Sequence, residues 1–443
     1  MLKKYIFLSL LVSFSFYGQC YQGFYIGDYH VVGLQSNGTL WGWGSSGFGQ
    51  LGNTNSINST PFQLAPGADW AKATVGRNNT FIIKTNGTLW AMGQGNYGLL
   101  GNGSTTQIQP TLQQIGTASN WQKISASSQM TIGLKTDGTL WGWGQNDQFE
   151  MGNGTCCADQ LTPIQVGTAT DWVALETSFG ASVFALKNDG TLWGWGLNAG
   201  GLLGDSTIMT RNVPTQLNTD SDWASIDVGA AHILALKTNG TLWSWGDGGY
   251  GQTGDGLTVP MYRFFPRQVG TATWSKVSAG FSVSFGIQPD GTLWAWGYNN
   301  LGQLGIGNTV NQFSPVQVGS ATNWESVVSG GYGFDNYTIA TQSDGTVWVW
   351  GDNQGGQYGN GTVGNPVYVP TEMPGFCTLL SSDSFTLKSA ITLYPNPATD
   401  TVSLAYELPA ATAVVALYDL SGRLITEKAL GGSSGSLTLA VGT

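Results

Sequence analysis

The chain has 443 residues, of which 41% are hydrophobic and only 9% are charged, and its formal net charge is −10. Nucleic acids and anionic membranes bind clustered lysine and arginine, whereas the 16 basic residues here are scattered, so the composition argues against both as partners. The 66 glycines and 19 tryptophans favour an all-β protein with many turns.

The first segment, residues 1–19, has the pattern of a secretory signal peptide. Lys3 and Lys4 precede an apolar run over residues 5–16, which is too short to span a bilayer. We therefore expect the chain to be exported. We expect no transmembrane segment elsewhere in it.

From residue 20 onward the chain repeats itself. A Gly-Thr-Leu-Trp sequence, with Val347 replacing leucine in the last copy, occurs seven times at spacings of 49 to 54 residues. The glycines of this repeat motif are Gly38, Gly87, Gly138, Gly190, Gly240, Gly291 and Gly345. A period near 50 residues with loops of varying length is typical of a repeat architecture.

Each copy of the motif predicts a β-hairpin. The glycine always follows Asn or Asp, as in Asn37-Gly38, and such pairs accept the positive φ angles of a type I′ turn. The flanking residues alternate in character, which places Trp193 and Trp195 on one face of a strand. We expect each repeat to form one small sheet.

Tryptophan and proline mark the ends of each repeat. Six repeats open on Trp70, Trp121, Trp172, Trp223, Trp274 or Trp324, and Tyr21 occupies this place in the first. A proline, which fits an outer edge strand, closes every repeat. Four strands in each of seven repeats predict an all-β, seven-bladed β-propeller over residues 20–378. The sequence leaves open whether residues 368–376 pair with the last blade or the first.

The Gly-x-x-His, Leu-Lys-x-Asp-Gly-Thr-Leu-Trp-x-Trp-Gly and Gly-Gln-Leu-Gly elements resemble the repeats of the regulator of chromosome condensation family, over about residues 21–375. The resemblance implies a seven-bladed propeller of repeats of ~51 residues. Ser127, Phe179 and the additional residues 330–335 depart from the family pattern. Family members act in guanine nucleotide exchange on a small GTPase, or as secreted bacterial inhibitors of β-lactamase. An exported protein would not meet the GTPase, and no inhibitor-specific residues can be matched.

The inventory of catalytic residues is nearly empty. His30 and His232 are the only histidines, and each occupies a position that the family pattern gives to a structural histidine. No Ser-His-Asp or Cys-His arrangement and no zinc-ligand spacing is present. We therefore predict no catalytic residue, no metal site and no cofactor, and we expect that the protein is not an enzyme.

Four cysteines fit an oxidising compartment. Cys20 precedes the first repeat and Cys377 follows the last, and a closed ring brings these ends together, which predicts a disulfide between them. Two free thiols, or lipidation of Cys20, are the alternatives. Cys156 and Cys157 are adjacent in the third repeat, where they either form a vicinal disulfide or have no role.

The loop of the fifth repeat is the first candidate for ligand binding. The other loops are mostly polar, whereas this one combines aromatic side chains with arginine, as binding hot spots do. Its residues are Met261, Tyr262, Arg263, Phe264, Phe265 and Arg267. Alternatively, the two phenylalanines pack beneath the loop or belong to the outer strand. The Tyr332, Phe334 and Tyr337 segment of the seventh repeat is a second candidate.

A different segment, residues 391–443, follows a linker over residues 379–390. Tyr394-Pro395-Asn396-Pro397, together with a later Tyr-Asp-x-x-Gly-Arg sequence that contains Gly422, resembles the type A C-terminal sorting domain of the type IX secretion system in the Bacteroidota. The resemblance implies a small β-sandwich that is recognised at the outer membrane. The Gly-x-Tyr strand and basic end of that family do not appear before Thr443, so we expect an incomplete domain.

We therefore expect a monomeric, non-catalytic propeller that is secreted by, or displayed on, a Gram-negative bacterium through the type IX machinery. It would bind a protein or surface ligand through one loop face. A lectin-like carbohydrate-binding protein and a proteinaceous inhibitor of a secreted enzyme are the alternatives. The sequence does not identify the ligand, protein or glycan, or the face that binds it.

Overall fold

The computed structural model describes residues 21–259, 261–331, 333, 335–373, 376, 391–394, 401–407, 412–418, 424–431 and 434–440. Contacts divide the chain into two compact units, of which one is Gln19–Leu379 and the other contains the tail Leu380–Thr443. The described residues form β-strands and two short 3-10 helices, η1 (Asn96–Gly98) and η2 (Ala199–Gly201), without an α-helix.

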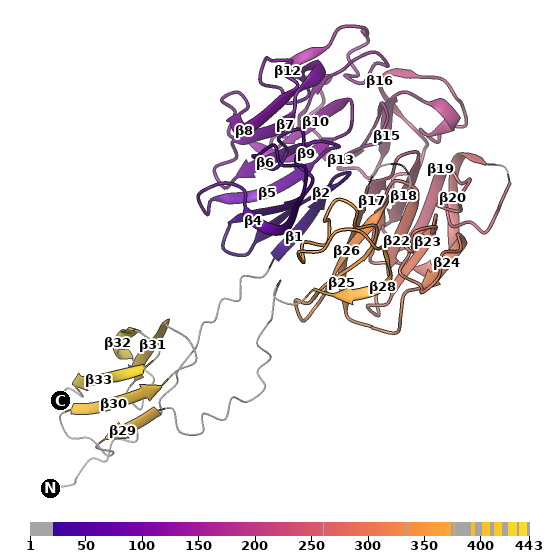
Figure 1. The fold of residues 1–443 in the computed structure, drawn as a ribbon. Helices are drawn as coiled ribbons and strands as arrows, with labels where there is room; N and C mark the ends of the chain where they lie inside the picture. Colours follow the sequence, from indigo (N-terminus) through magenta and orange to yellow (C-terminus); the bar gives the residue numbers. More distant parts are fainter. Residues whose placement is uncertain are drawn as a thin grey trace. The chain divides into compact units, whose positions relative to one another are not determined.

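The first unit is a β-propeller of seven four-stranded antiparallel sheets, each built from four consecutive strands (Figure 1). Blade 1 contains β1 (Tyr21–Ile26), β2 (His30–Gln35), β3 (Leu40–Gly44) and β4 (Asn58–Gln63). Blade 2 contains β5 (Trp70–Val75), β6 (Asn79–Lys84), β7 (Leu89–Gln94) and β8 (Ile108–Gln114). Blade 3 contains β9 (Trp121–Ala126), β10 (Met130–Lys135), β11 (Leu140–Gly144) and β12 (Gln160–Gln165). Blade 4 contains β13 (Trp172–Thr177), β14 (Ser182–Lys187), β15 (Leu192–Gly196) and β16 (Arg211–Gln216).

The remaining blades follow the same order. Blade 5 contains β17 (Trp223–Val228), β18 (His232–Lys237), β19 (Thr241–Asp247) and β20 (Tyr262–Thr273). Blade 6 contains β21 (Lys276–Ala279), β22 (Val283–Ile287), β23 (Leu293–Gly297) and β24 (Gln312–Gln317). Blade 7 contains β25 (Trp324–Gly330), β26 (Tyr337–Gln342), β27 (Val347–Gly351) and β28 (Val367–Glu372). The predicted all-β, seven-bladed propeller is thus confirmed.

The hairpin turns lie where the Asn-Gly and Asp-Gly pairs predict them, but the predicted type I′ turn is wrong. Only the glycine of each pair has a positive φ, between 76° and 84°, whereas a type I′ turn needs positive φ at both central residues. In blade 1, Gly38 N donates to Gln35 O at 2.9 Å, so the connection is a three-residue loop that ends in a left-handed glycine.

A chain of hydrogen bonds explains the rest of the repeat motif. In blade 1, Asn37 Oδ1 accepts hydrogen bonds from the backbone nitrogen and the hydroxyl of Thr39, at 3.0 and 2.7 Å. The Thr39 hydroxyl in turn accepts the indole N–H of Trp41 at 3.1 Å. The same three bonds recur in all seven blades, with aspartate in place of asparagine in four of them. The threonine therefore links the turn to the half-buried first tryptophan of the hairpin.

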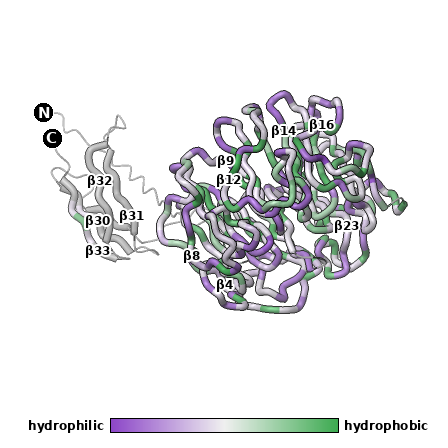
Figure 2. Tube along the Cα trace, turned by 90° about the horizontal axis from the view of Figure 1, so that it is seen from above, coloured by the Kyte–Doolittle hydropathy of each residue, from purple (hydrophilic) through white to green (hydrophobic). Residues whose placement is uncertain are grey.

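The second tryptophan of each hairpin joins neighbouring blades. We call these side chains, which are fully buried, the interface tryptophans: Trp43, Trp143, Trp195, Trp245, Trp296 and Trp350. Each donates its indole N–H to a backbone carbonyl of the preceding blade, over 2.7 to 2.9 Å. Blade 2 has Met92 instead, which cannot donate. The hydrophobic clusters likewise combine residues of adjacent blades, so the core lies between the blades. In Figure 2 the hydrophilic residues (purple) lie mostly in the loops.

The opening and first hairpin tryptophans enclose a lysine in blades 2 to 5. In blade 5 the Lys237 ammonium lies 4.9 Å from the ring centroids of both Trp223 and Trp243. It also forms ion pairs with Asp220 and Asp222 at 2.8 and 3.0 Å. In blade 1, Tyr21 pairs with the residue that corresponds to this lysine. Tyr21 therefore occupies the position of the opening tryptophan, as predicted.

The ring closes through side chains, since the last strand, β28, pairs with β27 of its own blade. Across the seam, the Tyr337 hydroxyl donates to His30 O at 2.9 Å. Phe376 packs against Tyr21 and Trp43, with ring centroids 5.5 and 5.4 Å apart. Tyr337 is therefore a buried seam residue and not part of a binding surface. The predicted Cys20–Cys377 disulfide lies outside the described residues, as do Tyr332 and Phe334.

The described part of the second unit consists of strands. β29 (Ile391–Tyr394), β30 (Thr401–Glu407) and β33 (Ser434–Ala440) form one sheet, and β31 (Thr412–Tyr418) and β32 (Leu424–Gly431) form another. Tyr394 of the sorting motif is the last residue of β29. The other residues of that motif, Pro395, Asn396, Pro397 and Gly422, lie outside the described residues.

Candidate functional site

One face of the propeller carries the long, variable loops. The four strands of a blade are consecutive and antiparallel, so the connections between strands one and two and between strands three and four emerge on the same side. We call this side the loop face. The short hairpin turns lie on the opposite side. Repeat proteins usually bind through the face that carries their variable loops.

The predicted binding loop of blade 5 continues directly into an outer strand. β20 has 12 residues, about twice the length of the other outer strands, and it begins at Tyr262. Its first aromatic residues pack against blade 4: the backbone at Gly200 and Gly201 approaches the Tyr262 and Phe264 rings so closely that a Cβ atom there would collide with them. Both phenylalanines therefore belong to the outer strand, which is one of the alternatives that the sequence left open.

Burial in the strand still leaves much of this aromatic surface accessible. Phe264 is 36% exposed and Phe265 is 49% exposed. Ser206 of the neighbouring blade 4 loop donates its backbone N–H to Phe264 O at 2.8 Å, and the exposed Ile208 and Met209 follow in that loop. We call these exposed side chains the blade 4/5 patch: Ile208, Met209, Met261, Tyr262, Phe264 and Phe265.

Arg263 is not a surface residue, although the sequence placed it in the binding loop. Its side chain is buried and forms a two-bond ion pair with Asp255, with Nε–Oδ2 at 2.6 Å and Nη2–Oδ1 at 3.0 Å. Arg267 lies 3.5 Å from the same carboxylate and 5.4 Å from the Phe265 ring centroid. In blade 4, Arg211 forms an ion pair with Asp205, in which Nε and Nη2 both donate to Asp205 Oδ2. These arginines are neutralised internally, so the blade 4/5 patch is mainly apolar.

A small cavity of about 160 Å³ opens at the centre of the loop face, where the first strands of all seven blades end. Asp28 and Arg77 form an ion pair in it at 2.9 Å, and burial raises the pKa of Asp28 to about 7. The Arg77 guanidinium lies 5.7 Å from the Phe179 ring, which contacts Phe281 edge-on at 5.1 Å. Phe179, a departure from the family pattern, therefore lines the mouth of the cavity.

A second charged group lies on the first strands of blades 3 to 5. Lys123 Nζ is 2.5 Å from Glu176 Oε1, and Ser125 donates to the other oxygen of that carboxylate at 3.3 Å. Burial and then the Glu176 charge raise the pKa of Asp227, whose oxygens accept backbone N–H groups. Every member of this group is engaged by its neighbours.

The two histidines are buried between blades, as the family pattern implies. His232 Nε2 lies 2.8 Å from Ser284 Oγ of the next blade, and His30 occupies the equivalent position in blade 1. Burial lowers the pKa of both imidazoles to about 3. Gly229 leaves room for the ring, because a Cβ atom there would lie 2.4 Å from His232 Cε1. Neither histidine reaches the surface as an acid–base group.

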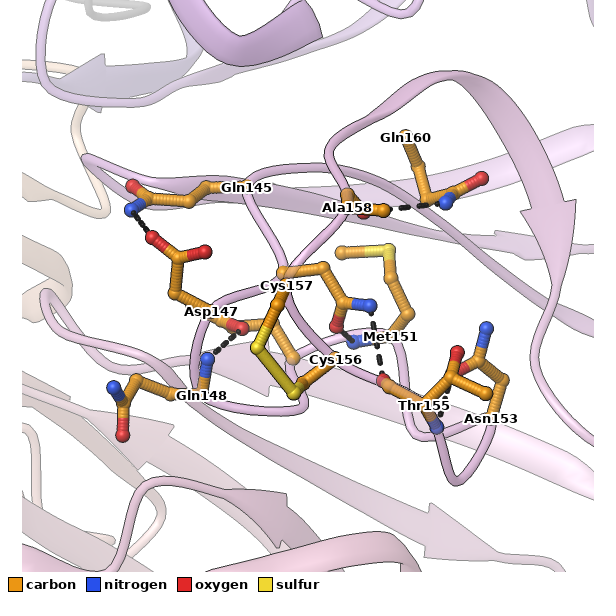
Figure 3. Close-up of a disulfide and its surroundings, with 12 residues drawn as sticks. Gln145, Asp147, Gln148, Met151, Asn153, Thr155, Cys156, Cys157, Ala158 and Gln160 are labelled. Atoms are coloured by element: carbon orange, nitrogen blue, oxygen red, sulfur yellow. Dashed lines mark hydrogen bonds between the residues drawn. A yellow bond between two sulfur atoms is a disulfide. The ribbon is translucent and has the colours of Figure 1, made fainter.

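The loop of blade 3 contains a disulfide between the adjacent residues Cys156 and Cys157, which the sequence had left open (Figure 3). Asn146 holds this loop through three hydrogen bonds. Its side-chain N–H donates to Thr155 O at 3.0 Å, its backbone carbonyl accepts Cys157 N at 2.8 Å, and its Oδ1 accepts Met151 N at 3.1 Å. Related asparagine clamps occur in blades 4, 6 and 7. Sequence reasoning missed this recurring asparagine.

The residues that the structure describes show neither a metal-binding cluster nor a helix that could span a membrane. No cluster of three or more His, Cys, Asp or Glu side chains among them has the arrangement needed to hold a metal ion. None of their helices has the length and apolar character of a membrane span.

Comparison with known families agrees with this geometry. A model of the regulator of chromosome condensation (RCC1) repeat matches residues 37–83, 86–134, 189–236 and 290–334, and a second RCC1 repeat model matches 121–150, 223–252 and 274–303. The chain belongs to the RCC1 repeat family. A secretion system C-terminal sorting domain model matches residues 392–442, which confirms the predicted sorting domain at the end of this RCC1-repeat protein.

Known relatives share the repeats in other contexts. The chain is 28% identical over 342 residues to the ultraviolet-B receptor UVR8 of Arabidopsis thaliana, covering 75% of this chain and 65% of the receptor. It is 29% identical over 246 residues to the human E3 ubiquitin-protein ligase HERC2, covering 52% of this chain and 5% of the ligase. The chain thus spans less than two thirds of the length of these curated relatives.

Solved structures show the same fold at lower identity. Human WBSCR16 has a TM-score of 0.65 at 19% identity, covering 75% of this chain and 94% of that structure. Yeast RCC1 (Prp20), in a structure with Kap60, has a TM-score of 0.66 at 19% identity, covering 84% of this chain and 89% of that one. At this identity the likeness establishes the fold alone.

Proposed function

We propose that this RCC1-repeat protein is a non-catalytic binding scaffold that acts outside the cell and captures a protein partner through the blade 4/5 patch. The sorting domain supports action outside the cytoplasm. The absence of an accessible acid–base histidine among the described residues supports a binding role over a catalytic one.

One observation carries the choice of surface. The blade 4/5 patch exposes several large apolar side chains on two adjacent, hydrogen-bonded segments. Exposing contiguous apolar side chains costs solubility, so such surfaces commonly mark a binding site. Aromatic side chains that are already held by a strand lose little conformational entropy on binding.

The chemistry of the patch favours an apolar protein surface as the partner. Arg263 is buried in its ion pair with Asp255, so it is not available to bind a carboxylate or phosphate. The exposed aromatic residues Tyr262 and Phe265 remain available for contacts with apolar side chains. A glycan partner would instead need polar groups beside the rings, and we give it second place.

Export follows from the two ends of the chain in this proposal. Residues 1–19 act as a signal peptide, residues 20–378 form the functional propeller, residues 379–390 are a linker, and residues 391–443 direct the chain to the type IX machinery. The protein would then be released, or held at the outer membrane surface of a Gram-negative bacterium, as a monomer. The RCC1 repeats and the sorting domain support this division.

Affinity capture from the surface and medium of the producing organism tests the proposal. The full chain is compared with a patch variant, Tyr262→Ser/Phe264→Ser/Phe265→Ser, after circular dichroism has shown that both fold. A matched control, Val310→Ser/Val363→Ser, removes apolar side chains that are 63% and 49% exposed in the loops of blades 6 and 7.

We expect a partner that is captured by the unmodified chain and by the control but not by the patch variant. Equal capture by all three chains would refute the assignment of the patch. The captured complex is also assayed for turnover of a substrate. Turnover that is lost when the propeller is altered, and not when the partner is altered, would refute the non-catalytic role.

A further inference from the structure

The loop of blade 3, residues 145–160, departs from the other six loops at several points. Phe149 has a φ of +64°, at a position where every other blade has a glycine. Cys157 also has a positive φ, +70°. Left-handed backbone is costly for residues other than glycine, and such costs concentrate in functional segments.

A buried carboxyl group adds to these departures. Glu150 replaces the glutamine that four other blades have at this position. Its Oε2 accepts Gln148 N at 2.7 Å, as the glutamine oxygen does elsewhere. Its Oε1 is buried and has no hydrogen-bond partner among the described residues. Three unfavourable features within nine residues mark this loop as one that is not built for stability alone.

The Cys156–Cys157 disulfide also contributes little to stability. A disulfide stabilises mainly by removing conformational freedom from the unfolded chain, and this effect grows with the length of the loop that it closes. A bond between adjacent residues closes the shortest loop possible. The presence of this disulfide in an exposed loop is therefore not explained by stability.

The disulfide is accessible to small reagents. Cys157 is exposed and Cys156 is half-buried, and both lie on the loop face. Asp147 belongs to the same loop, where its carboxylate accepts a hydrogen bond from Gln145 Nε2 at 2.7 Å (Figure 3). Asp159 follows Cys157 by two residues, and burial and then the charge of Asp147 raise its pKa. The exposed loop that contains the disulfide therefore carries two acidic side chains.

We propose that Cys156–Cys157 is a thiol–disulfide exchange site that takes neutral thiols in preference to anionic ones. A thiolate attacks Sγ of Cys157, the more exposed residue of the pair, the S–S bond breaks, and Cys156 leaves as a thiolate that takes up a proton. If the reagent is a dithiol, its second thiolate then attacks the mixed disulfide. Cys157 is released, protonated in turn, and the reagent leaves as a cyclic disulfide, so two electrons pass to the protein.

Reduction changes the loop. Opening the disulfide ring frees Cys157 from its left-handed conformation, so the backbone from Thr155 to Ala158 can relax away from Asn146. Asn146 also holds Met151, next to the Glu150 carbonyl that accepts the Trp195 indole of blade 4 at 2.8 Å. The site is thereby connected to the interface between blades 3 and 4.

The test compares two small monothiols of similar thiol acidity, neutral 2-mercaptoethanol and anionic 2-mercaptoethanesulfonate, on the folded full chain at low ionic strength. Released thiols are alkylated and assigned by peptide mass mapping, which scores Cys156 and Cys157 separately from Cys20 and Cys377. We expect about threefold to tenfold faster exchange with the neutral thiol, which corresponds to about 0.7 to 1.4 kcal/mol of additional repulsion of the anion by the two carboxylates together. Added salt should reduce the difference.

Asp147→Asn/Asp159→Asn should remove most of the difference, whereas Asp290→Asn/Asp344→Asn, which removes two negative charges from the hairpin turns on the opposite face, should leave it intact. The proposal is overturned if Cys156 and Cys157 stay unmodified in a folded chain exposed to excess dithiothreitol. It is equally overturned if the two monothiols react at the same rate in the unmodified protein.

Discussion

The interface tryptophans allow a sharp test of how the blades are held together. Trp245→Phe and Trp296→Phe remove the same atoms from two fully buried positions. Trp245 Nε1 donates to Leu202 O at 2.9 Å, and no other donor among the described residues reaches that oxygen. Trp296 Nε1 donates to Gln252 O at 2.9 Å, but Ser284 Oγ also donates to it, at 2.7 Å.

The two variants should therefore differ in stability. Loss of the indole volume is common to both and cancels in the comparison. Only Trp245→Phe leaves a buried carbonyl unpaired, at a cost of about 1–3 kcal/mol. We expect its melting temperature to be lower than that of Trp296→Phe by about 2–6 °C, measured by far-ultraviolet circular dichroism so that the lost fluorophore does not matter. Equal destabilisation, or a larger loss in Trp296→Phe, would refute the role assigned to these hydrogen bonds.

Three further predictions follow from the same structure. Thr80→Val should lower the free energy of unfolding by about 1–3 kcal/mol, because it removes the hydroxyl that donates to Gln50 O and Met92 cannot replace that donor. Thr131→Val should lower it less, since the carbonyl that accepts this hydroxyl keeps an indole donor. Denaturant titration measures both changes. Lys237→Gln removes a cation that lies between two indole rings, so it should lower the free energy of unfolding by about 1 kcal/mol. An unchanged free energy of unfolding in the same assay would contradict a stabilising role for this cation. Burial lowers the folded-state pKa of His232 to about 3, below its ordinary value near 6.5, so its contribution to stability is full above pH 6.5 and falls towards pH 3. His232→Asn should therefore flatten the acid side of a melting-temperature profile, and an unchanged slope would show that the imidazole is not neutral in the folded state.

The sequence pattern predicted the fold because the same local features recur in all seven repeats. Alternation, turn residues and opening tryptophans all indicate one four-stranded blade, and Tyr21 was placed correctly by register alone. The turn type was wrong because Asn37-Gly38 is compatible with more than one hairpin. The choice depends on the preceding residue, whose φ the sequence does not reveal. Pairing of the last strand was open for a related reason, since the Phe376 ring contacts blade 1 while the preceding strand β28 hydrogen-bonds to β27 of blade 7.

The candidate site was less accessible from the sequence. The sequence of a loop does not show which of its aromatic and arginine side chains are exposed and which are buried. Arg263 is buried because it pairs with the Asp255 carboxylate, eight residues upstream. An Asp-x7-Arg spacing in a loop is a signal that could have shown this pairing. The conformation of Cys156 and Cys157 depends on Asn146, which the turn of the loop brings close and whose backbone carbonyl accepts Cys157 N. No pattern in the sequence indicates that contact.

The most direct test of the proposed function is the affinity of the captured partner for purified chains, measured by surface plasmon resonance. The account predicts that Tyr262→Ser/Phe264→Ser/Phe265→Ser weakens binding at least about tenfold, as expected for loss of aromatic hot-spot residues, while Val310→Ser/Val363→Ser leaves the dissociation constant unchanged. A patch variant that binds as tightly as the unmodified protein would contradict it.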